Sequence, residues 1–244
     1  MQKVEIVGVN INNVTLEECN GILEGFLESD RLNMIFTPNS ELLYNAVKDR
    51  AFEELLNAAQ LVIPDGIGVV IASRFYKTPL KERVTGIDLM GKLAELAAKK
   101  GKNLYLLGAS QEVIETAAER FKEKYEGINI TGYRNGYFRK EDEDSIVDDI
   151  NSASADILLV GLGSPKQEDF IYRNRDRLKA KVAIGIGGSF DIVAGKITRA
   201  PEFMQKAGLE WLHRLIKQPS RIGRMLKLPK FILLAFYDSK TRSR

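Results

Sequence analysis

The sequence predicts an α/β fold of Rossmann-like type, in which helices cover a mostly parallel sheet. Two observations lead to this prediction. Short apolar or β-branched runs alternate along the chain with segments whose apolar residues recur at helical spacing, and that alternation is typical of βαβ units. Several of the runs, such as residues 157–160 and 182–186, are apolar almost without interruption, as expected for strands buried on both faces of a parallel sheet.

The individual elements follow in order from these patterns. Strands are expected at residues 4–9, 34–36, 61–63, 104–107, 128–132, 157–160 and 182–186, with helices such as 87–98 and 113–125 between them. After about residue 195 no strand pattern remains, and residues 202–217 are expected to form one helix. Pro219 either ends that helix or lies in the first turn of the next. We therefore divide the chain into an α/β catalytic core, 1–195, and a helical appendage, 196–244.

The composition is that of a globular protein suited to a reducing compartment. The chain of 244 residues is 44% hydrophobic and 28% charged, which excludes a disordered polypeptide. Its single cysteine, Cys19, excludes an internal disulfide. We expect no signal peptide, because the N-terminus runs straight into a strand pattern. We also expect no membrane-spanning helix, because the longest apolar stretch, 231–237, falls far short of the roughly 20 residues that one needs.

Positive charge is concentrated at the C-terminal end of the chain. Residues 211–244 contain nine Lys or Arg residues and one acidic residue, Asp238, so this segment carries 9 − 1 = +8. The net charge of the whole chain is +3, which leaves 3 − 8 = −5 for residues 1–210. A basic end on a mildly acidic body predicts an anionic partner. Leu, Ile and Met alternate with the charges, which favours a helix on an anionic membrane surface over a nucleic-acid partner.

Two glycine-rich segments follow the last two predicted strands, where parallel α/β sheets bind their ligands. Residues 161–168 include Gly163, and residues 187–191 include Gly187, Gly188 and Asp191. Glycines let the backbone approach a phosphate, and the helix that follows offers N–H groups to an anion. Either segment alone could be an ordinary tight turn. Two such segments in one sheet favour a diphosphate ligand.

Polar side chains after other strands are candidates for contacts with a sugar. Asp65 follows a buried-looking strand, where it could face a cleft or, equally, cap the helix that begins near residue 67. Thr37, Asn39 and Gln167 are suited to hydrogen bonds with sugar hydroxyl or acetamido groups, and each could instead be a cap or turn residue. Arg83 lies in a charged segment, where a surface position is the commoner role.

The composition excludes several kinds of catalytic centre. One histidine, His213, and one cysteine cannot assemble a His/Cys metal site or a His-based triad, and we expect His213 at a surface or interface. Residues 142–144 spell an Asp-x-Asp pattern that can hold a metal, but they precede apolar residues at helical spacing. We expect them to be the acidic first turn of an amphipathic helix. The sequence therefore favours chemistry without a metal or other cofactor.

Six segments together resemble one family. They are TPNSE, IPDGIGVV, ERVTGIDL, VGLGSPKQE, GIGGSFDIVAGK and RAPEFMQKAGLEWLHRL, and they occur in the order that the family has. From about residue 5 to 230 the chain thus resembles the family-26 glycosyltransferases, the N-acetylmannosaminyltransferases of wall teichoic acid and enterobacterial common antigen synthesis. The likeness is greatest to the teichoic acid branch.

The resemblance implies an inverting, metal-independent transfer of ManNAc from UDP-ManNAc to undecaprenyl-diphosphate-GlcNAc, forming a β-1,4 linkage. It implies that Asp65 is the general base and that Gln167 and Arg83 also take part in catalysis. The implied substrate-binding residues are Thr37, Asn39, Gly163, Gly187, Gly188, Asp191, Arg214, Arg221 and Arg224. The last three arginines, in the basic appendage, are expected to reach the UDP diphosphate. We expect a peripheral enzyme on the inner face of the cell membrane, which could form homo-oligomers away from it.

Other functions stay open on the sequence alone. The same fold and lipid acceptor could serve a different donor, UDP-ManNAcA or UDP-glucose. A non-catalytic nucleotide-binding module with a basic arm is a further alternative. An NAD(P)-dependent oxidoreductase is disfavoured, because the GxGxxG fingerprint is incomplete.

Overall fold

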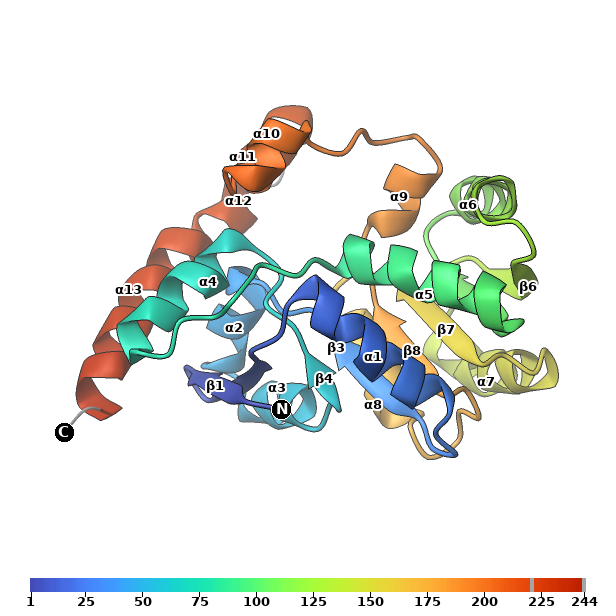
Figure 1. The fold of residues 1–244 in the computed structure, drawn as a ribbon, viewed down its shortest axis with the longest axis horizontal. Helices are drawn as coiled ribbons and strands as arrows, with labels where there is room; N and C mark the ends of the chain where they lie inside the picture. The colour runs from blue at the N-terminus through green and yellow to red at the C-terminus, as the bar shows by residue number, and fades with distance from the viewer. Residues whose placement is uncertain (220–221, 243–244) are drawn as a thin grey trace. The chain divides into compact units, whose positions relative to one another are not determined.

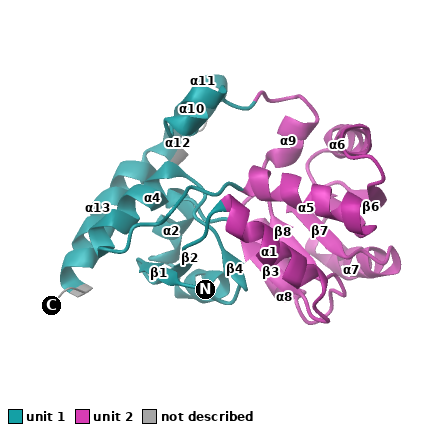
Figure 2. Cartoon of the chain, viewed as in Figure 1, with its two compact units in different colours: residues 1–15, 37–85, 199–244 teal, residues 16–36, 86–198 magenta. Residues whose placement is uncertain are grey.

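The computed structural model describes residues 1–219 and 222–242 of the chain (Figure 1). They form two compact units, each assembled from separate stretches of sequence (Figure 2). Unit 1 comprises residues 1–15, 37–85 and 199–244, and unit 2 comprises residues 16–36 and 86–198. The division at residue 195 between a catalytic core and an appendage concerns function, and it stays a prediction.

A parallel sheet forms the centre of unit 2. Its strands lie in the order β3-β8-β7-β5-β6, and every neighbouring pair is parallel. Their bounds are β3 (Asn33–Phe36), β5 (Asn103–Gly108), β6 (Asn129–Arg134), β7 (Ile157–Gly161) and β8 (Val182–Gly185). The four residues of β8 are all buried. The predicted α/β fold is confirmed, and each predicted strand of this unit is present within two residues of its expected bounds.

Helices cover this sheet with their apolar faces. They are α1 (Leu16–Leu27), α5 (Gly86–Lys100), α6 (Gln111–Lys124), α7 (Glu143–Ser152), α8 (Lys166–Arg173) and α9 (Ser189–Val193), with a 3₁₀ turn η2 (Lys140–Asp142). Helix α1 packs against α5, and α8 packs against β3 and β8. The helices predicted at 87–98 and 113–125 are confirmed as α5 and α6. Helix α8 matters most for the site, because it begins directly after a glycine-rich strand end.

Unit 1 begins with a hairpin where a single strand was expected. Strands β1 (Lys3–Ile6) and β2 (Val9–Asn12) pair antiparallel. The turn between them is made by Val7 and Gly8, whose φ angles are 46° and 91°. Two central residues at positive φ give the tight turn that suits the twist of a hairpin. The prediction of one strand over 4–9 is wrong, because the chain turns at Val7 and Gly8. Valine rarely takes positive φ, so the sequence gives no indication of this turn.

The middle of unit 1 is a short strand with helices on either side of it in the sequence. Helices α2 (Ser40–Ala46) and α3 (Arg50–Asn57) precede strand β4 (Leu61–Val62). Helix α4 (Ile67–Ser73) and the 3₁₀ turn η1 (Arg74–Tyr76) follow it. The strand predicted at 61–63 is confirmed as β4. A Cβ on Gly68 would overlap the side chains of Ser40 and Leu228. Helix α4 can therefore pack closely against its neighbours only with glycine at this position.

The C-terminal segment is helical, as expected, but it is more interrupted than the sequence suggested. It contains α10 (Glu202–Lys206), α11 (Glu210–Lys217), α12 (Ile222–Met225) and α13 (Lys227–Arg242). The single helix predicted over 202–217 is wrong, because Gly208 adopts a φ of 71° between α10 and α11. A Cβ on Gly208 would lie 2.7 Å from Cγ1 of Ile67, so this break also lets the chain pass close to α4. Among the described residues after 195, no strand occurs.

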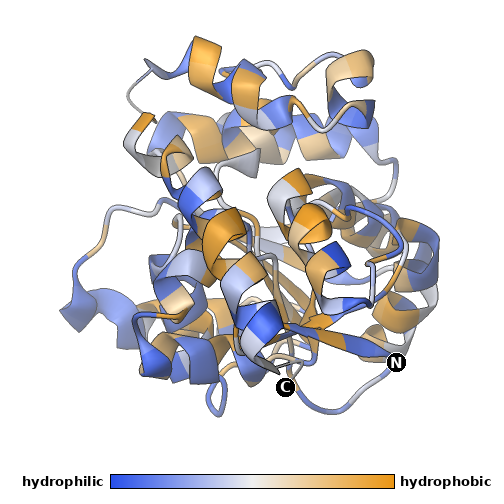
Figure 3. Cartoon of the chain, turned by 90° about the vertical axis from the view of Figure 1, so that its left-hand side faces the viewer, coloured by the Kyte–Doolittle hydropathy of each residue, from blue (hydrophilic) through white to orange (hydrophobic). Residues whose placement is uncertain are grey.

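Helix α13 is attached to unit 1 along one face. Phe231, Ala235 and Ser239 lie four residues apart and are 0%, 0% and 4% exposed, and the helix packs against α2 and α4. Figure 3 shows hydrophobic and hydrophilic residues interspersed along this helix, which ends at the C-terminus. Within the described ranges, no helix is both long enough and apolar enough to cross a bilayer.

Polar contacts fix both ends of α13. At its start, Lys227 Nζ donates to Glu41 Oε1 at 3.1 Å and to Asn45 Oδ1 at 3.2 Å. Further along, the Tyr76 hydroxyl donates to Asp238 Oδ2 at 2.7 Å and accepts the Val7 N–H at 3.2 Å. Tyr76 thereby joins three segments of unit 1 that are distant in sequence.

We predict that Tyr76→Phe lowers the free energy of unfolding by about 2 kcal/mol, because it removes a hydrogen bond to a carboxylate and one from a backbone N–H. Thermal and urea unfolding would measure the change. The matched control is Tyr237→Phe, at a residue that is 62% exposed, which should leave stability within about 0.5 kcal/mol of the original. Equal stabilities for the two variants would show that Tyr76 does not anchor α13.

Candidate active site

Asp65 lies in a tight turn between β4 and α4. Its N–H donates to the carbonyl oxygens of Ile63 at 3.0 Å and Pro38 at 3.2 Å. Gly66, with a φ of 108°, is the N-cap of α4, and that cap has no side-chain hydrogen bond. The N-cap residue of α4 is therefore Gly66, and Asp65 is the residue before it. The residue as a whole is partly exposed.

Asn39 and Thr37 lie on the segment that precedes α2. Asn39 is the N-cap of α2, and its Oδ1 accepts the N–H groups of Glu41 at 2.9 Å and Leu42 at 3.2 Å. A Cβ placed on Gly66 would lie 3.6 Å from the Asn39 Cβ, so this segment lies beside the Asp65 turn. Thr37 is 8% exposed. The capping role of Asn39 is confirmed, and its contact with a substrate stays a prediction.

Arg83 belongs to a cluster of three arginines around one buried carboxylate. Its Nη2 lies 3.2 Å from Oε2 of Glu210, the first residue of α11. Oε1 of Glu210 lies 3.2 Å from Arg214 Nη2 and 3.9 Å from Arg199 Nε. The side chain of Glu210 is 7% exposed and that of Arg83 is 16% exposed. Three guanidinium groups thus lie near one carboxylate, and guanidinium groups of this kind are suited to binding an anionic ligand.

The other two arginines of the appendage that were predicted to bind substrate are Arg221 and Arg224. Arg224 lies within α12, and Arg221 lies outside the described residues. Helix α11 ends at Lys217, with Gln218 as its C-cap. The helix that precedes Pro219 therefore ends before it, so the basic residues on either side of Pro219 do not share one continuous helix. His213 lies within α11 and is partly exposed, which agrees with the expected surface or interface position.

In unit 2, the glycine-rich strand ends leave backbone open to a ligand. Gly163 and Gly187 have φ angles of 75° and 55°, and a Cβ on either would meet nothing within 4 Å. Gly163 precedes α8, and Gly188 is the N-cap of α9, whose first turn contains Asp191. Both turns thus combine accessible backbone with the start of a helix, as the sequence predicted. Binding of a diphosphate at them stays a prediction.

Gln167 connects these two glycine-rich turns. It lies in the first turn of α8 and is 2% exposed. Its Oε1 accepts the Gly187 N–H at 2.8 Å, and its Nε2 donates to Glu168 Oε1 at 2.8 Å. A Cβ on Gly185 would lie 2.6 Å from Gln167 Nε2, so the absence of a side chain there makes room for the amide. Gln167 therefore holds the 187–188 turn in place from within unit 2.

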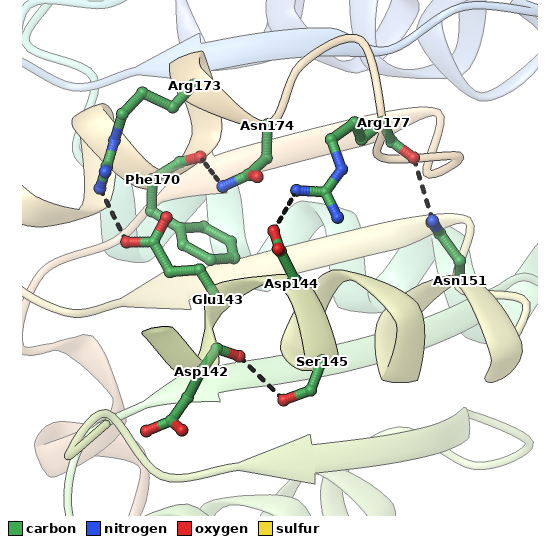
Figure 4. A network of polar contacts seen from close by, with 9 residues as sticks. All are labelled: Asp142, Glu143, Asp144, Ser145, Asn151, Phe170, Arg173, Asn174 and Arg177. Atoms are coloured by element: carbon green, nitrogen blue, oxygen red, sulfur yellow. Dashed lines mark hydrogen bonds and ion pairs between the residues drawn. The ribbon is translucent and has the colours of Figure 1, made fainter. Parts of the chain in front are cut away.

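The Asp-x-Asp pattern at 142–144 is part of a surface network (Figure 4). Glu143 Oε1 accepts from Arg173 Nη2 at 2.8 Å, and Asp144 Oδ1 accepts from Arg177 Nη1 at 2.6 Å. The Arg139 N–H donates to Asp142 at 3.0 Å, which lowers the pKa of that carboxyl. Glu143 and Asp144 lie in the first turn of α7, so the prediction of an acidic first turn is confirmed.

Comparison with known proteins places the chain in a family. The model of the glycosyl transferase WecG/TagA/CpsF family matches residues 4–244. The chain belongs to this family of glycosyltransferases. Its relatives include N-acetylglucosaminyldiphosphoundecaprenol N-acetyl-beta-D-mannosaminyltransferases from Bacillus spizizenii, 38% identical over 85% of this chain and 80% of the relative, and from Staphylococcus aureus strain MW2, 35% identical over 94% and 91%. The Bacillus subtilis 168 protein of the same name is 38% identical over 86% and 81%.

Three residues of this glycosyltransferase were not singled out from the sequence. Glu210 and Arg199 complete the cluster around Arg83, and Glu168 orients Gln167. Glu168 stands beside Gln167 in the motif VGLGSPKQE, but only its complete burial separates it from the many exposed acidic residues of the chain. No local pattern indicates that Glu210 pairs with Arg83, because the two residues come from distant segments.

We predict that Glu210→Gln lowers the free energy of unfolding of the enzyme by about 3 kcal/mol, because it leaves three guanidinium groups around an uncharged amide. Phosphate or sulfate should restore part of the loss, because either anion can replace the missing charge. Glu202→Gln is the control: its side chain is 86% exposed, and the change should be below about 0.5 kcal/mol. A Glu210→Gln variant as stable as the original, with or without phosphate, would contradict this view of the cluster.

Proposed function

We propose that this glycosyltransferase transfers N-acetylmannosamine from UDP-ManNAc to undecaprenyl-diphosphate-GlcNAc. The names of the relatives, at 35–38% identity over most of both chains, carry this proposal. In wall teichoic acid synthesis this step would add the second sugar to the lipid-linked acceptor. The reaction produces UDP, and inversion at the anomeric carbon would give a β-1,4 linkage.

Asp65 is the proposed general base. In an inverting transfer the acceptor hydroxyl attacks the anomeric carbon from the side opposite UDP, and a carboxylate must take the proton of that hydroxyl. Asp65 is partly exposed and lies directly before Gly66, the N-cap residue of α4. Thr37 and Asn39 precede α2, beside the Asp65 turn, and we assign them to contacts with sugar hydroxyl or acetamido groups.

The leaving UDP gains negative charge, which N–H groups or arginines must stabilise where no metal does so. The turns at Gly163 and at Gly187–Gly188 present backbone near helix starts, with Asp191 in the first turn of α9; the N–H of Gly187 itself donates to Gln167, so other N–H groups of the turn would meet the UDP. Gln167 contributes by holding Gly187. Arg83 and Arg214 supply positive charge in a cluster that Glu210 neutralises only in part, and we assign Arg221 and Arg224 the same function.

The C-terminal helices are the proposed contact with the membrane that holds the lipid acceptor. Exposed apolar residues lie among the basic ones there, at 64% exposure for Ile216, 56% for Leu226 and 57% for Leu233. Such a surface suits peripheral binding to anionic lipid on the inner face of the cell membrane. Homo-oligomer formation away from the membrane stays a prediction.

Asp65→Asn tests the proposed base. The amide keeps the size of the carboxylate but cannot take a proton, so turnover should fall on the order of 10²–10⁴-fold while the affinity for UDP-ManNAc is retained. Steady-state kinetics and calorimetric titration would measure the two quantities. Asp142→Asn is the matched control and should keep normal turnover. Near-normal turnover of Asp65→Asn would remove Asp65 from the mechanism.

Metal independence has its own test. Transfer should continue at an unchanged rate in excess EDTA, because N–H groups and arginines are proposed to stabilise the leaving UDP. The assay would follow UDP release with and without chelator. Loss of activity in EDTA, restored by Mg²⁺ or Mn²⁺, would contradict the proposal and direct attention back to residues 142–144.

Charge reversal of exposed lysines tests the membrane contact. Replacing Lys217, Lys230 and Lys240 with glutamate should abolish sedimentation with phosphatidylglycerol vesicles, because each surface lysine contributes about 1 kcal/mol to binding anionic lipid. Transfer to a soluble, short-chain acceptor should stay unchanged. The control reverses Lys99, Lys122 and Lys140, which are exposed residues of unit 2. If both triple variants bind vesicles equally well, the appendage does not make the contact.

A further inference from the structure

Glu168 is a fully buried carboxyl group that the proposed mechanism does not use. It lies in the first turn of α8 and is 0% exposed. Glutamate side chains are almost never completely buried unless a partner satisfies them. An apolar residue of similar size would fill the same space without the cost of burying a carboxyl group. The presence of the carboxyl therefore calls for an explanation beyond packing.

The contacts of Glu168 are concentrated on one oxygen. Oε1 accepts from Ser164 Oγ and from Gln167 Nε2, both at 2.8 Å. Among the described residues, Oε2 has no hydrogen-bond partner. Burial raises the pKa of the Glu168 carboxyl, although the hydrogen bonds from Gln167 and Ser164 act in the opposite direction. Oε1 is thus the oxygen through which Glu168 contacts its neighbours.

The contact with Glu168 decides which way the Gln167 amide points. A glutamine amide has an accepting oxygen at one end and a donating NH₂ group at the other. Glu168 accepts from the NH₂ end, so the oxygen end faces the N–H of Gly187, 2.8 Å away. In the flipped orientation two donors would meet at Gly187 and two acceptors would meet at Glu168. Each of those contacts is unfavourable in a buried site.

We propose that Glu168 is a positioning residue that fixes the Gln167 amide and, through it, the Gly187–Gly188 turn, which binds the diphosphate of the nucleotide sugar. The inference rests on the proposed function, because that function makes the turn a binding site. The chemical class of the ligand is a nucleoside diphosphate, and the probe is UDP alone.

The experiment compares Glu168→Gln with Glu168→Leu. Gln keeps an accepting oxygen at the Oε1 position, so UDP affinity should stay within about twofold of the original. Leu removes the acceptor, so the dissociation constant for UDP should rise by about tenfold. In both variants, the chemical shift of the Gly187 amide in ¹⁵N-glycine-labelled protein reports directly on its hydrogen bond. That resonance should move in Glu168→Leu and stay in place in Glu168→Gln.

A double-mutant cycle separates positioning from a general loss of stability. Gln167→Met removes the amide through which Glu168 acts, so Glu168→Leu should weaken UDP binding no further in that background. Additive losses would overturn the proposal. Should Glu168→Leu fail to fold, Glu168→Asp replaces it, because a carboxyl withdrawn by one methylene should also shift the Gly187 resonance and weaken UDP binding.

The outcomes also distinguish this inference from the function on which it rests. Normal UDP binding and an unmoved Gly187 resonance in Glu168→Leu would overturn the positioning role alone. A Gly187 resonance that moves in Glu168→Leu but does not respond to UDP in the original protein would overturn the diphosphate assignment of the turn. Failure of the original protein to bind UDP at all would overturn the proposed donor as well.

Discussion

The side chain of Gln167 fits against strand β8 only because residue 185 is a glycine, where a Cβ would lie 2.6 Å from the amide nitrogen. This close fit brings the start of α8 to the end of β8, and the amide then accepts the Gly187 N–H. The two glycine-rich turns of unit 2 are thereby joined by a buried polar side chain rather than left as independent loops. A turn fixed before the ligand arrives has less entropy to lose on binding, which favours tight binding of a diphosphate. Glu168 completes the arrangement because it determines which end of the amide faces Gly187.

Unit 1 depends on a different constraint, the burial of charge. Glu210 is almost enclosed and lies near three arginines, so the start of α11 is attached to the segment that carries Arg83. Further along, α13 buries Phe231 and Ala235 completely and is held through Lys227 and Tyr76. The appendage is thus part of the packing of unit 1. Its deletion would expose the surfaces of α2 and α4 that α13 covers, and for that reason point substitutions test its function better than truncation.

Much of the fold could be predicted from the sequence because buried parallel strands and amphipathic helices leave clear periodic patterns. Those patterns do not predict unusual backbone conformations. The Val7–Gly8 turn was missed because valine rarely takes positive φ, and the break at Gly208 was missed because the apolar residues around it keep helical spacing. In the candidate site, too, local patterns predicted some residues and missed others. Motif and strand position indicated Asp65, Asn39 and the glycine-rich turns, and the structure confirmed that Asn39 is a cap. Pairings between distant segments, such as Arg83 with Glu210, and complete burial, as for Glu168, are properties of the folded chain that local sequence does not encode.

The choice of donor sugar tests the account most directly. The purified enzyme would be given equal concentrations of UDP-ManNAc, UDP-ManNAcA and UDP-glucose with a defined lipid-diphosphate-GlcNAc acceptor, and the product would be identified by mass spectrometry and its linkage by NMR. We expect a single product that carries one added ManNAc residue in β-1,4 linkage, with one UDP released per transfer. A product containing the uronic acid or glucose, an α-linked product, or release of UDP without transfer to the acceptor would contradict the proposed reaction.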